Sequence, residues 1–301
     1  MKKQNPQSKI PSRGVLLIAL GSAHYGRMAA NAAASIRFCD KYIPIHLVYS
    51  HNSLSHLTPE HRSLFTSMAE CPPEFMEQNG QQCFIKAKTC LYELSPFTET
   101  LFMDVDLLWF GAPVSKLMDD LSPVDFTTQS RGCYDYATGI GTKGYTSWCS
   151  EHEAQQAYKL SGKIYRLSSE VVWFRKNKQT KKLFKLVREV FDKPKVRPSF
   201  EFRGNLPDEL AYNIATAKLQ MYPRKENEVF IYWELMDKKV AGTWSEVIKK
   251  YYGYSMGGNN VHPFVRERYE QMAKAHAQAL RLPYHFKLFP KKQWDKLRAV
   301  I

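Results

Sequence analysis

The chain has 301 residues, of which 44% are hydrophobic and 13% aromatic, so it can bury a sizeable core and global disorder is excluded. No apolar run approaches the roughly 20 residues that a membrane-spanning helix needs, and the polar segment 1–13 predicts a disordered leader without a signal peptide. The net charge of +14 excludes an acidic chain and favours anionic partners.

The excess positive charge belongs to the second half of the chain. Residues 1–160 carry 14 basic and 15 acidic side chains, whereas residues 161–301 carry 29 basic and 14 acidic ones. Such one-sided basicity favours a polyanionic partner, such as nucleic acid, a phosphorylated glycan or an anionic membrane. The alternative is that the charge serves only solubility and the attraction of nucleotide phosphates.

The cysteines show no metal-binding or disulfide spacing. They are Cys39, Cys71, Cys83, Cys90, Cys133 and Cys149. Because no CxxC pair occurs among them, we expect reduced thiols in a cytoplasmic protein that has no zinc site.

The first elements predict a βαβ unit. Segment 14–20 is a short apolar run of the buried-strand type, residues 28–39 carry an alanine-rich helical pattern, and 43–49 reads as the next strand. Strand, helix and strand of these lengths predict a parallel sheet, and such sheets bind ligands at the carboxyl ends of their strands. Residues 21–25 occupy that end of the first strand.

Two acids one residue apart mark the most informative stretch, LFMDVDLLWF at residues 101–110. Asp104 and Asp106 alternate with apolar residues, so a single strand would put both carboxylates on one face. Unpaired buried charge is costly, and Mg²⁺ or Mn²⁺ would compensate it if the phosphates of a ligand completed the metal shell. The pair predicts a metal–diphosphate site for a nucleotide sugar. The alternative is a local ion pair at the end of a strand.

The remaining pattern predicts one α/β domain. Helices are expected at 86–94, 179–191 and 208–219. Strands are expected at 171–174 and 229–235, with long loops at 126–150 and 194–207. We expect the domain to span residues 14–264 and to be followed by a basic helical C-terminal extension, 265–301.

The ordered set of motifs resembles the GT-A glycosyltransferases, most closely the family of glycogenin and bacterial lipopolysaccharide glycosyltransferases (glycosyltransferase family 8). The motifs are Gly-Ser-Ala-His-Tyr at 21–25, a lysine-bearing helix, LFMDVDLLWFG at 101–111, and LPDELAYN at 206–213. They occur in the family's order and span about two thirds of the chain. The resemblance implies a Rossmann-like, mostly parallel sheet flanked by helices.

The resemblance also implies a donor site. Asp104 and Asp106 would hold Mn²⁺ or Mg²⁺ on the diphosphate of a UDP-sugar, and Asp104 would also touch the ribose. His262 stands where a third metal ligand is expected. Lys88, sixteen residues before Asp104, would contact phosphate or sugar.

The nucleotide base and the sugar have their own implied contacts. Tyr25 would stack on the base, and Gly21 and Ser22 would let the backbone approach it. Asp208 and Glu209 would face the sugar as catalytic acids, although the family usually has Gln at the second position.

Three further positions compare with the family as follows. Asn213 lies one helical turn after Glu209 and would share its face, as a donor contact. The family's His-Phe-x-Gly-x-x-Lys-Pro-Trp ending is absent, and Val-His-Pro-Phe at 261–264 is a partial substitute. Ser-Ser-Glu at 168–170 replaces the family's Asn-(Ser/Ala)-Gly.

The implied reaction is transfer of a hexose, with retention at the anomeric carbon, to a hydroxyl acceptor. Three acceptor classes remain open: a hydroxymethylated DNA base, a lipopolysaccharide or other surface glycan, and a protein hydroxyl. A DNA acceptor would be bound through its phosphates, and its base would have to be flipped out of the stack. With a glycan acceptor, the basic C-terminus would bind the inner membrane face. The alternative function is a catalytically degenerate GT-A domain that acts as a basic nucleic-acid-binding or structural module.

Ordinary structural roles compete with these assignments. Tyr25 would then be a half-buried tyrosine, Lys88 a solvated lysine, and Asp208 and Glu209 acids that favour a helix dipole. His262 would be structural. A row of helix cations is either an acceptor-docking surface or a solvated face. These cations are Lys176, Lys178, Lys181, Lys182, Lys185 and Arg188.

Overall fold

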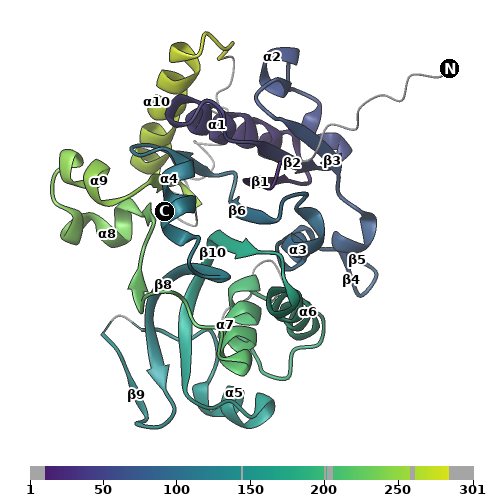
Figure 1. The fold of residues 1–301 in the computed structure, drawn as a ribbon, viewed down its shortest axis with the longest axis vertical. Coiled ribbons are helices and arrows are strands. Elements are labelled where there is room, and N and C mark those ends of the chain that lie inside the picture. The colour runs from purple at the N-terminus through teal and green to yellow at the C-terminus, as the bar shows by residue number, and fades with distance from the viewer. Residues whose placement is uncertain (1–10, 144, 200, 202–205, 258–261, 285–301) are drawn as a thin grey trace.

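The computed structural model describes residues 11–143, 145–199, 201, 206–257 and 262–284. Its centre is a sheet in the order β11-β8-β10-β6-β1-β2-β3, with β9 paired to β8 (Figure 1). The strands are β1 (Arg13–Ala19), β2 (Ile45–Tyr49), β3 (Ser67–Glu70), β6 (Glu99–Met103), β8 (Phe126–Asp135), β9 (Ile140–Gly141), β10 (Lys163–Arg175) and β11 (Asn227–Glu228).

One half of this sheet is parallel. β3, β2, β1 and β6 run side by side in the same direction, and Leu17 of β1 is paired with both Leu47 and Met103. β10 is antiparallel to β6 and to β8, so β8 again points along β6. The predicted α/β fold with a mostly parallel sheet is therefore confirmed.

Helices cover both faces of the sheet, because alternate residues of the buried strands point to opposite sides. Val15 and Leu17 join a core with α1 (Ala23–Cys39) and α10 (Pro263–Ala279), which pack on each other. Leu16 joins the opposite core with α6 (Lys178–Asp192) and α7 (Asp208–Leu219). Figure 1 shows these two pairs of helices on either side of the strands.

A second, smaller sheet stands beside the first, in the order β12-β13-β7. Its strands are β12 (Ile231–Tyr232), β13 (Gly253–Ser255) and β7 (Leu107–Trp109), and β4 (Glu77–Gln78) pairs with β5 (Gln81–Gln82). The remaining helices are η1 (His51–Leu54), α2 (Pro59–Arg62), η2 (Pro73–Phe75), η3 (Phe84–Cys90), α3 (Leu91–Leu94), α4 (Val114–Leu121), α5 (Glu151–Tyr158), α8 (Glu234–Ala241) and α9 (Trp244–Lys250).

The prediction of one acid-bearing strand at 101–110 is wrong. β6 ends at Met103, and β7 begins at Leu107 in the smaller sheet. Asp104 and Asp106 therefore lie in the turn between two sheets, not on one strand face. We call residues 104–106 the acid turn.

Other boundaries also differ from the predictions. The expected loop 126–150 contains β8 and β9, the expected helix 86–94 is a 3₁₀ segment, η3, followed by α3, and 229–235 holds a two-residue strand before α8. The expected strand 171–174 is the end of the long strand β10. The helices predicted at 179–191 and 208–219 are confirmed as α6 and α7, and the first helix begins at Ala23 instead of residue 28.

The two ends of the chain are described in part. Residues 1–10 and 285–301 lie outside the described residues, so most of the predicted leader 1–13 and the last part of the predicted C-terminal extension 265–301 lie there too. Arg13 already belongs to β1, and α10 packs against α1 with Tyr269 in the core. Within the part that the structure describes, no helix is both long and apolar enough to cross a bilayer.

Candidate active site

The acid turn is held from both sheets. The backbone N–H of Asp104 donates to the carbonyl of Glu170 in β10, at 2.8 Å. The carbonyl of Asp106 accepts from the N–H of Met256, just after β13, at 3.1 Å. Since β6 leads into the turn at its carboxyl end, the two acids stand at the sheet edge where parallel α/β sheets bind ligands.

Lys88 neutralises part of the charge of the turn. Its Nζ lies 2.8 Å from Oδ2 of Asp104 and 3.5 Å from Oδ2 of Asp208. The hydroxyl of Tyr212 donates to the Lys88 carbonyl at 2.7 Å, which fixes η3 against α7. Burial opposes the charged form of Lys88, but Asp104, Asp208 and then Glu209 raise its pKa well above the usual value.

Asp106 retains an unused acceptor. Its Oδ1 is buried and has no hydrogen-bond partner among the described residues, and burial raises the pKa of this carboxyl. The pKa of Asp104 is raised as well, chiefly by burial and further by Asp106, against the opposing effect of Lys88. An orphaned carboxylate oxygen beside a second carboxylate fits Mg²⁺ or Mn²⁺, which take oxygen ligands and accept phosphates to complete the shell.

Asp208 and Glu209 form the first turn of α7, after Pro207. The Asp208 side chain is almost fully buried beside Lys88. Burial, and then the charge of Asp208, raise the pKa of Glu209 well above its usual value. The structure therefore places Asp208 against Lys88, which also contacts the acid turn, and Glu209 acts on the same lysine through its charge.

The glycine–tyrosine segment lies at the carboxyl end of β1, as predicted. Gly21 has φ +91°, and a Cβ there would come within 2.9 Å of the Phe84 ring in η3. Its N–H donates to Oγ of Ser50 at 2.8 Å. Ser22 precedes α1 as its exposed N-cap residue, and Tyr25 in the first turn is 38% exposed. The Tyr25 ring is therefore available to a ligand at this edge.

Two predicted residues are placed differently from the rest. Asn213 is buried, and its Oδ1 accepts from the N–H of Leu167 at 3.1 Å, beside an irregularity in the β10–β8 pairing. His262 is exposed and is the N-cap residue of α10. Among the described residues, no three His, Cys, Asp or Glu side chains are grouped for a metal. The roles of Asn213 and His262 stay predictions.

Glu170 is a buried carboxylate of the site that the sequence analysis noted only as a departure from a motif. Its Oε1 accepts from Ser255 Oγ at 2.6 Å, and its Oε2 accepts from Trp233 Nε1 at 2.5 Å. Burial, and then the charge of Asp106, raise its pKa to about 7. Because its partners come from distant parts of the chain, no local pattern marks this residue.

The comparisons with known proteins concern the fold. No protein-family model matches the chain, and no curated protein matches it by sequence. A solved galactosyltransferase, LgtC, in complex with donor and acceptor sugar analogues, aligns with a TM-score of 0.55 at 13% identity, over 94% of this chain and 99% of that one. An active-site mutant of LgtC gives a TM-score of 0.52 at 13% identity, over 87% and 95% of the two chains.

A third solved structure extends the comparison. The bifunctional glycosyltransferase WbbM gives a TM-score of 0.52 at 12% identity, and the alignment covers 90% of this chain and 50% of WbbM. At these identities the likeness concerns the backbone arrangement and not the individual side chains. The chain has the GT-A fold of these glycosyltransferases.

Proposed function

We propose that the protein is a metal-dependent glycosyltransferase that transfers a hexose from a UDP-sugar to a hydroxyl acceptor, with retention at the anomeric carbon. The buried, unpartnered Oδ1 of Asp106 beside the Asp104–Lys88 pair is the observation that carries the proposal. It lies at the ligand-binding edge of a sheet that is shared with known glycosyltransferases. The identity of the base as uracil rests on the motif resemblance.

Asp104 and Asp106 are the residues that would hold Mn²⁺ or Mg²⁺. A divalent cation supplies charge that stabilises a leaving diphosphate. Lys88 adds a fixed positive charge at the same place, since its Nζ is already buried between Asp104 and Asp208. The Lys88 ammonium can also donate a hydrogen bond to a phosphate group that binds there.

Asp208 and Glu209 are proposed to face the sugar. Their position at the start of α7 puts the positive end of the helix dipole behind two carboxylates, which favours their charged forms against burial. In this role they hydrogen-bond the sugar hydroxyls or stabilise positive charge that develops on the ring. Tyr25, Gly21 and Ser22 are proposed to bind the base at the end of β1.

The test is donor turnover. Purified protein is incubated with a panel of UDP-sugars and Mn²⁺ or EDTA, and the released UDP is measured. We expect slow, metal-dependent hydrolysis of one donor that is lost in Asp104→Ala and Asp106→Ala. No release, together with no thermal stabilisation by any UDP-sugar with metal, would refute the proposal and favour the non-catalytic basic module.

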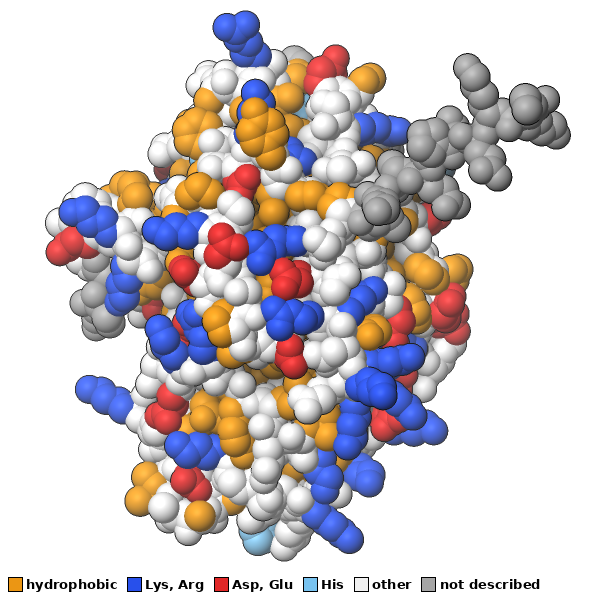
Figure 2. Space-filling view, in the orientation of Figure 1, with side chains coloured by type: hydrophobic (Ala, Val, Ile, Leu, Met, Phe, Trp, Pro, Cys, Tyr) orange, Lys and Arg blue, Asp and Glu red, His pale blue; other side chains and the backbone are white. Residues whose placement is uncertain are grey.

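We further propose that the acceptor is polyanionic and docks on α6. Four of the six cations predicted for this surface are exposed, namely Lys178, Lys181, Lys182 and Lys185. The other two have partners in the fold, because Lys176 donates to the Ser95 carbonyl and Arg188 pairs with Glu93. Figure 2 shows Lys and Arg gathered on the side of the molecule where α6 lies in Figure 1.

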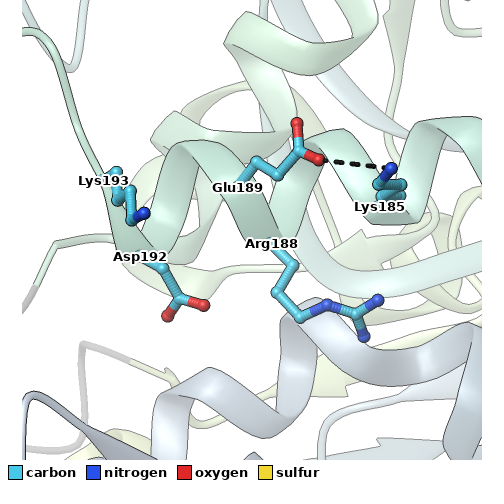
Figure 3. A pocket seen from close by; sticks show the side chains of 5 residues that line it. All are labelled: Lys185, Arg188, Glu189, Asp192 and Lys193. Atoms are coloured by element: carbon cyan, nitrogen blue, oxygen red, sulfur yellow. Dashed lines mark ion pairs between the residues drawn. The ribbon is translucent and has the colours of Figure 1, made fainter.

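A pocket at the end of α6 shares only Lys185 and Arg188 with the six cations considered for this docking surface. It has a volume of about 250 Å³ and is lined by the five residues labelled in Figure 3. Lys185 pairs with Glu189 at 3.7 Å, and Asp192 pairs with Lys86 at 3.3 Å. The lining has three cations and two acids, so its excess of one positive charge gives it little power to select an anion.

The docking proposal is tested by charge reversal. Replacing Lys178, Lys181 and Lys182 with Glu is expected to raise the KM for the acceptor at least about tenfold and to leave donor hydrolysis unchanged. The same change at the exposed residues Lys41, Lys116 and Lys225 is the matched control. Hydroxymethylated DNA and a phosphorylated surface glycan are the two acceptors to compare. An equal effect of both triple variants would contradict docking on α6.

The place of action is proposed from the cysteines. All six are free, and Cys39 alone among them is not fully buried. Unpaired thiols suit a reducing compartment, so we propose that the protein works in the cytoplasm, with peripheral contact to the inner membrane face if the acceptor is a lipid-linked glycan.

A further inference from the structure

The Glu170 carboxylate is enclosed by groups that donate hydrogen bonds. Ser255 and Trp233 donate at 2.6 and 2.5 Å, and Ser168 Oγ lies 3.4 Å from Oε2. The amide of Gln129 donates to Oε2 at 3.4 Å. An indole N–H can only donate, so this surrounding suits an ionised carboxylate, which can only accept.

The orientation of Gln129 is fixed by its other bonds. Its Oε1 accepts from the backbone N–H groups of Phe230 and Ile231, both at 2.9 Å. Its NH₂ group therefore has to face Glu170. The carboxylate thus draws donors from β8, from β10 and from the segment around β12 and β13.

The Glu170 carboxylate has no ion-pair partner among the described residues, and Lys88 acts on it only through space. Within the described part of the chain, Glu170 has no ion pair with Lys, Arg or His, whereas the buried acids Glu228 and Glu234 pair with Arg224 and Arg268. The largest charge effect on its pKa comes from Asp106, which is also negative, and Lys88 opposes this effect more weakly. The carboxylates of Asp104, Asp106 and Glu170 therefore act on one another in one region. Lys88 is in contact with one of them, Asp104.

Glu170 also lies against the segment that follows β13. A Cβ on Gly257 would lie 3.1 Å from Glu170 Oε1 and 3.5 Å from the Trp233 ring, so the backbone at Gly257 packs directly on this cluster. The preceding residue, Met256, donates its N–H to the Asp106 carbonyl. The Glu170 side chain and the acid turn are thus joined through the same short stretch of backbone.

We propose that Glu170 is a positioning residue of the cation site, whose charge, held without an ion-pair partner, raises the affinity of Asp104 and Asp106 for a divalent cation without ligating it. Both of its oxygens are already occupied by donors, so it acts through the field at the acid turn and through the backbone contacts. The inference rests on the proposed function, in which the acid turn binds Mn²⁺ or Mg²⁺. Partners of this kind around metal ligands typically change metal affinity by about 10- to 100-fold.

The test is direct binding of Mn²⁺ in the presence of UDP, measured by the loss of the electron paramagnetic resonance signal of free Mn²⁺. Glu170→Gln keeps the shape, and Ser255 can accept from the new NH₂ while Trp233 still donates. We expect the Kd for Mn²⁺ to rise about 10- to 100-fold in this variant. A Kd within about threefold of the wild-type value overturns the inference.

Glu234→Gln is the matched control. Glu234 is a buried glutamate of the neighbouring segment that accepts from the Tyr254 hydroxyl at 2.8 Å and pairs with Arg268. This variant is expected to leave the Kd for Mn²⁺ within about threefold of wild type, since a general loss of stability does not alter the charge at the turn. An equal weakening in both variants would overturn a specific role for Glu170.

Two further outcomes separate the hypotheses. If Glu170→Gln does not fold, Glu170→Asp and Glu170→Asn replace it, because they shorten the side chain equally and differ only in charge. The Glu170→Asp variant is then expected to bind Mn²⁺ at least about tenfold more tightly than the Glu170→Asn variant, and equal affinities overturn the inference. If the wild-type protein binds no Mn²⁺ with UDP, the proposed function itself fails, whatever the variants do.

Discussion

Replacing Lys88 with Met tests how the acid turn is stabilised before a cation arrives. The change keeps the length of the side chain and removes the charge that lies 2.8 Å from Asp104 and 3.5 Å from Asp208. Removing one partner of a fully buried ion pair costs about 3–5 kcal/mol, because the remaining charge is left uncompensated. The Lys88 side chain is 17% exposed, so we expect a loss of about 3 kcal/mol in EDTA.

This loss translates into a measurable change of the melting temperature, Tm. With an unfolding entropy of about 2.1 cal/mol/K per residue, a chain of 301 residues loses about 5 °C in Tm for 3 kcal/mol. Excess Mn²⁺ is expected to raise the Tm of Lys88→Met more than that of the wild-type protein, because the cation replaces the missing positive charge. Thermal unfolding followed by circular dichroism, in EDTA and in Mn²⁺, measures both effects.

Lys86→Met is the matched control for this experiment. Lys86 lies in the same 3₁₀ segment, has a similarly buried side chain and pairs with Asp192 at 3.3 Å, away from the acid turn. The Lys86→Met variant is expected to be less stable than the wild-type protein, and Mn²⁺ is expected to raise its Tm by no more than it raises that of the wild type. An unchanged Tm of Lys88→Met in EDTA, or equal stabilisation of all three proteins by Mn²⁺, would refute the reasoning.

Two further predictions concern the fold. Gly26→Ala is expected to lose about 2–3 kcal/mol by chemical denaturation, since its Cβ would lie 1.8 Å from the Ser53 carbonyl oxygen. Gly80→Ala has φ +75° but open space, so it should lose only about 1 kcal/mol, and equal losses would argue against the close approach at Gly26. Burial lowers the pKa of His46 and of His276 to about 4, so between pH 6.5 and 4 the unfolded chain binds more protons than the folded one. Stability should therefore fall as the pH drops through this range, by about 2 kcal/mol per histidine at pH 5, and His46→Asn should flatten the curve measured by urea unfolding.

The sequence predicted those elements whose pattern is local. The helix at 208–219 follows a proline and starts with two acids, and the helix at 179–191 has a clear apolar stripe, so both were found within a residue or two of their ends. The sequence also predicts Lys88 and Asp104 as donor contacts and Asp208 as a catalytic acid, and the structure brings these three side chains together. These three residues lie in motifs that occur along the chain in the order typical of the family that the sequence resembles.

The acid turn was misread because hydrophobicity does not distinguish one sheet from another. Val105 is buried in the turn itself, so the alternation of apolar residues continues from β6 through the turn into β7. The sequence predicts a loop where β8 lies because residues 126–150 are rich in Gly, Thr, Ser and Tyr, although Thr127, Thr128 and Gln129 are buried. Thr128, for example, donates to the Val171 carbonyl at 2.7 Å, and a sequence pattern alone does not show that such partners exist.

Glu170 was missed for a different reason. Its environment is assembled from Gln129, Trp233 and Ser255, which lie in three separate segments, and no spacing within the chain relates them. Only the three-dimensional arrangement distinguishes this glutamate from an ordinary strand residue.

The pairing of β7 with β13 has a consequence for the order in which the protein is made. Trp109 pairs with Gly253, and Met256 supports the Asp106 carbonyl, so half of the frame around the acid turn is synthesised late. A nascent chain that has reached β10 already holds the strands β6, β1 and β2, but its acid turn still lacks the smaller sheet. Because β12, β13 and Met256 follow β10 by more than 50 residues, most of the large sheet can pair during synthesis before the frame of the acid turn is complete.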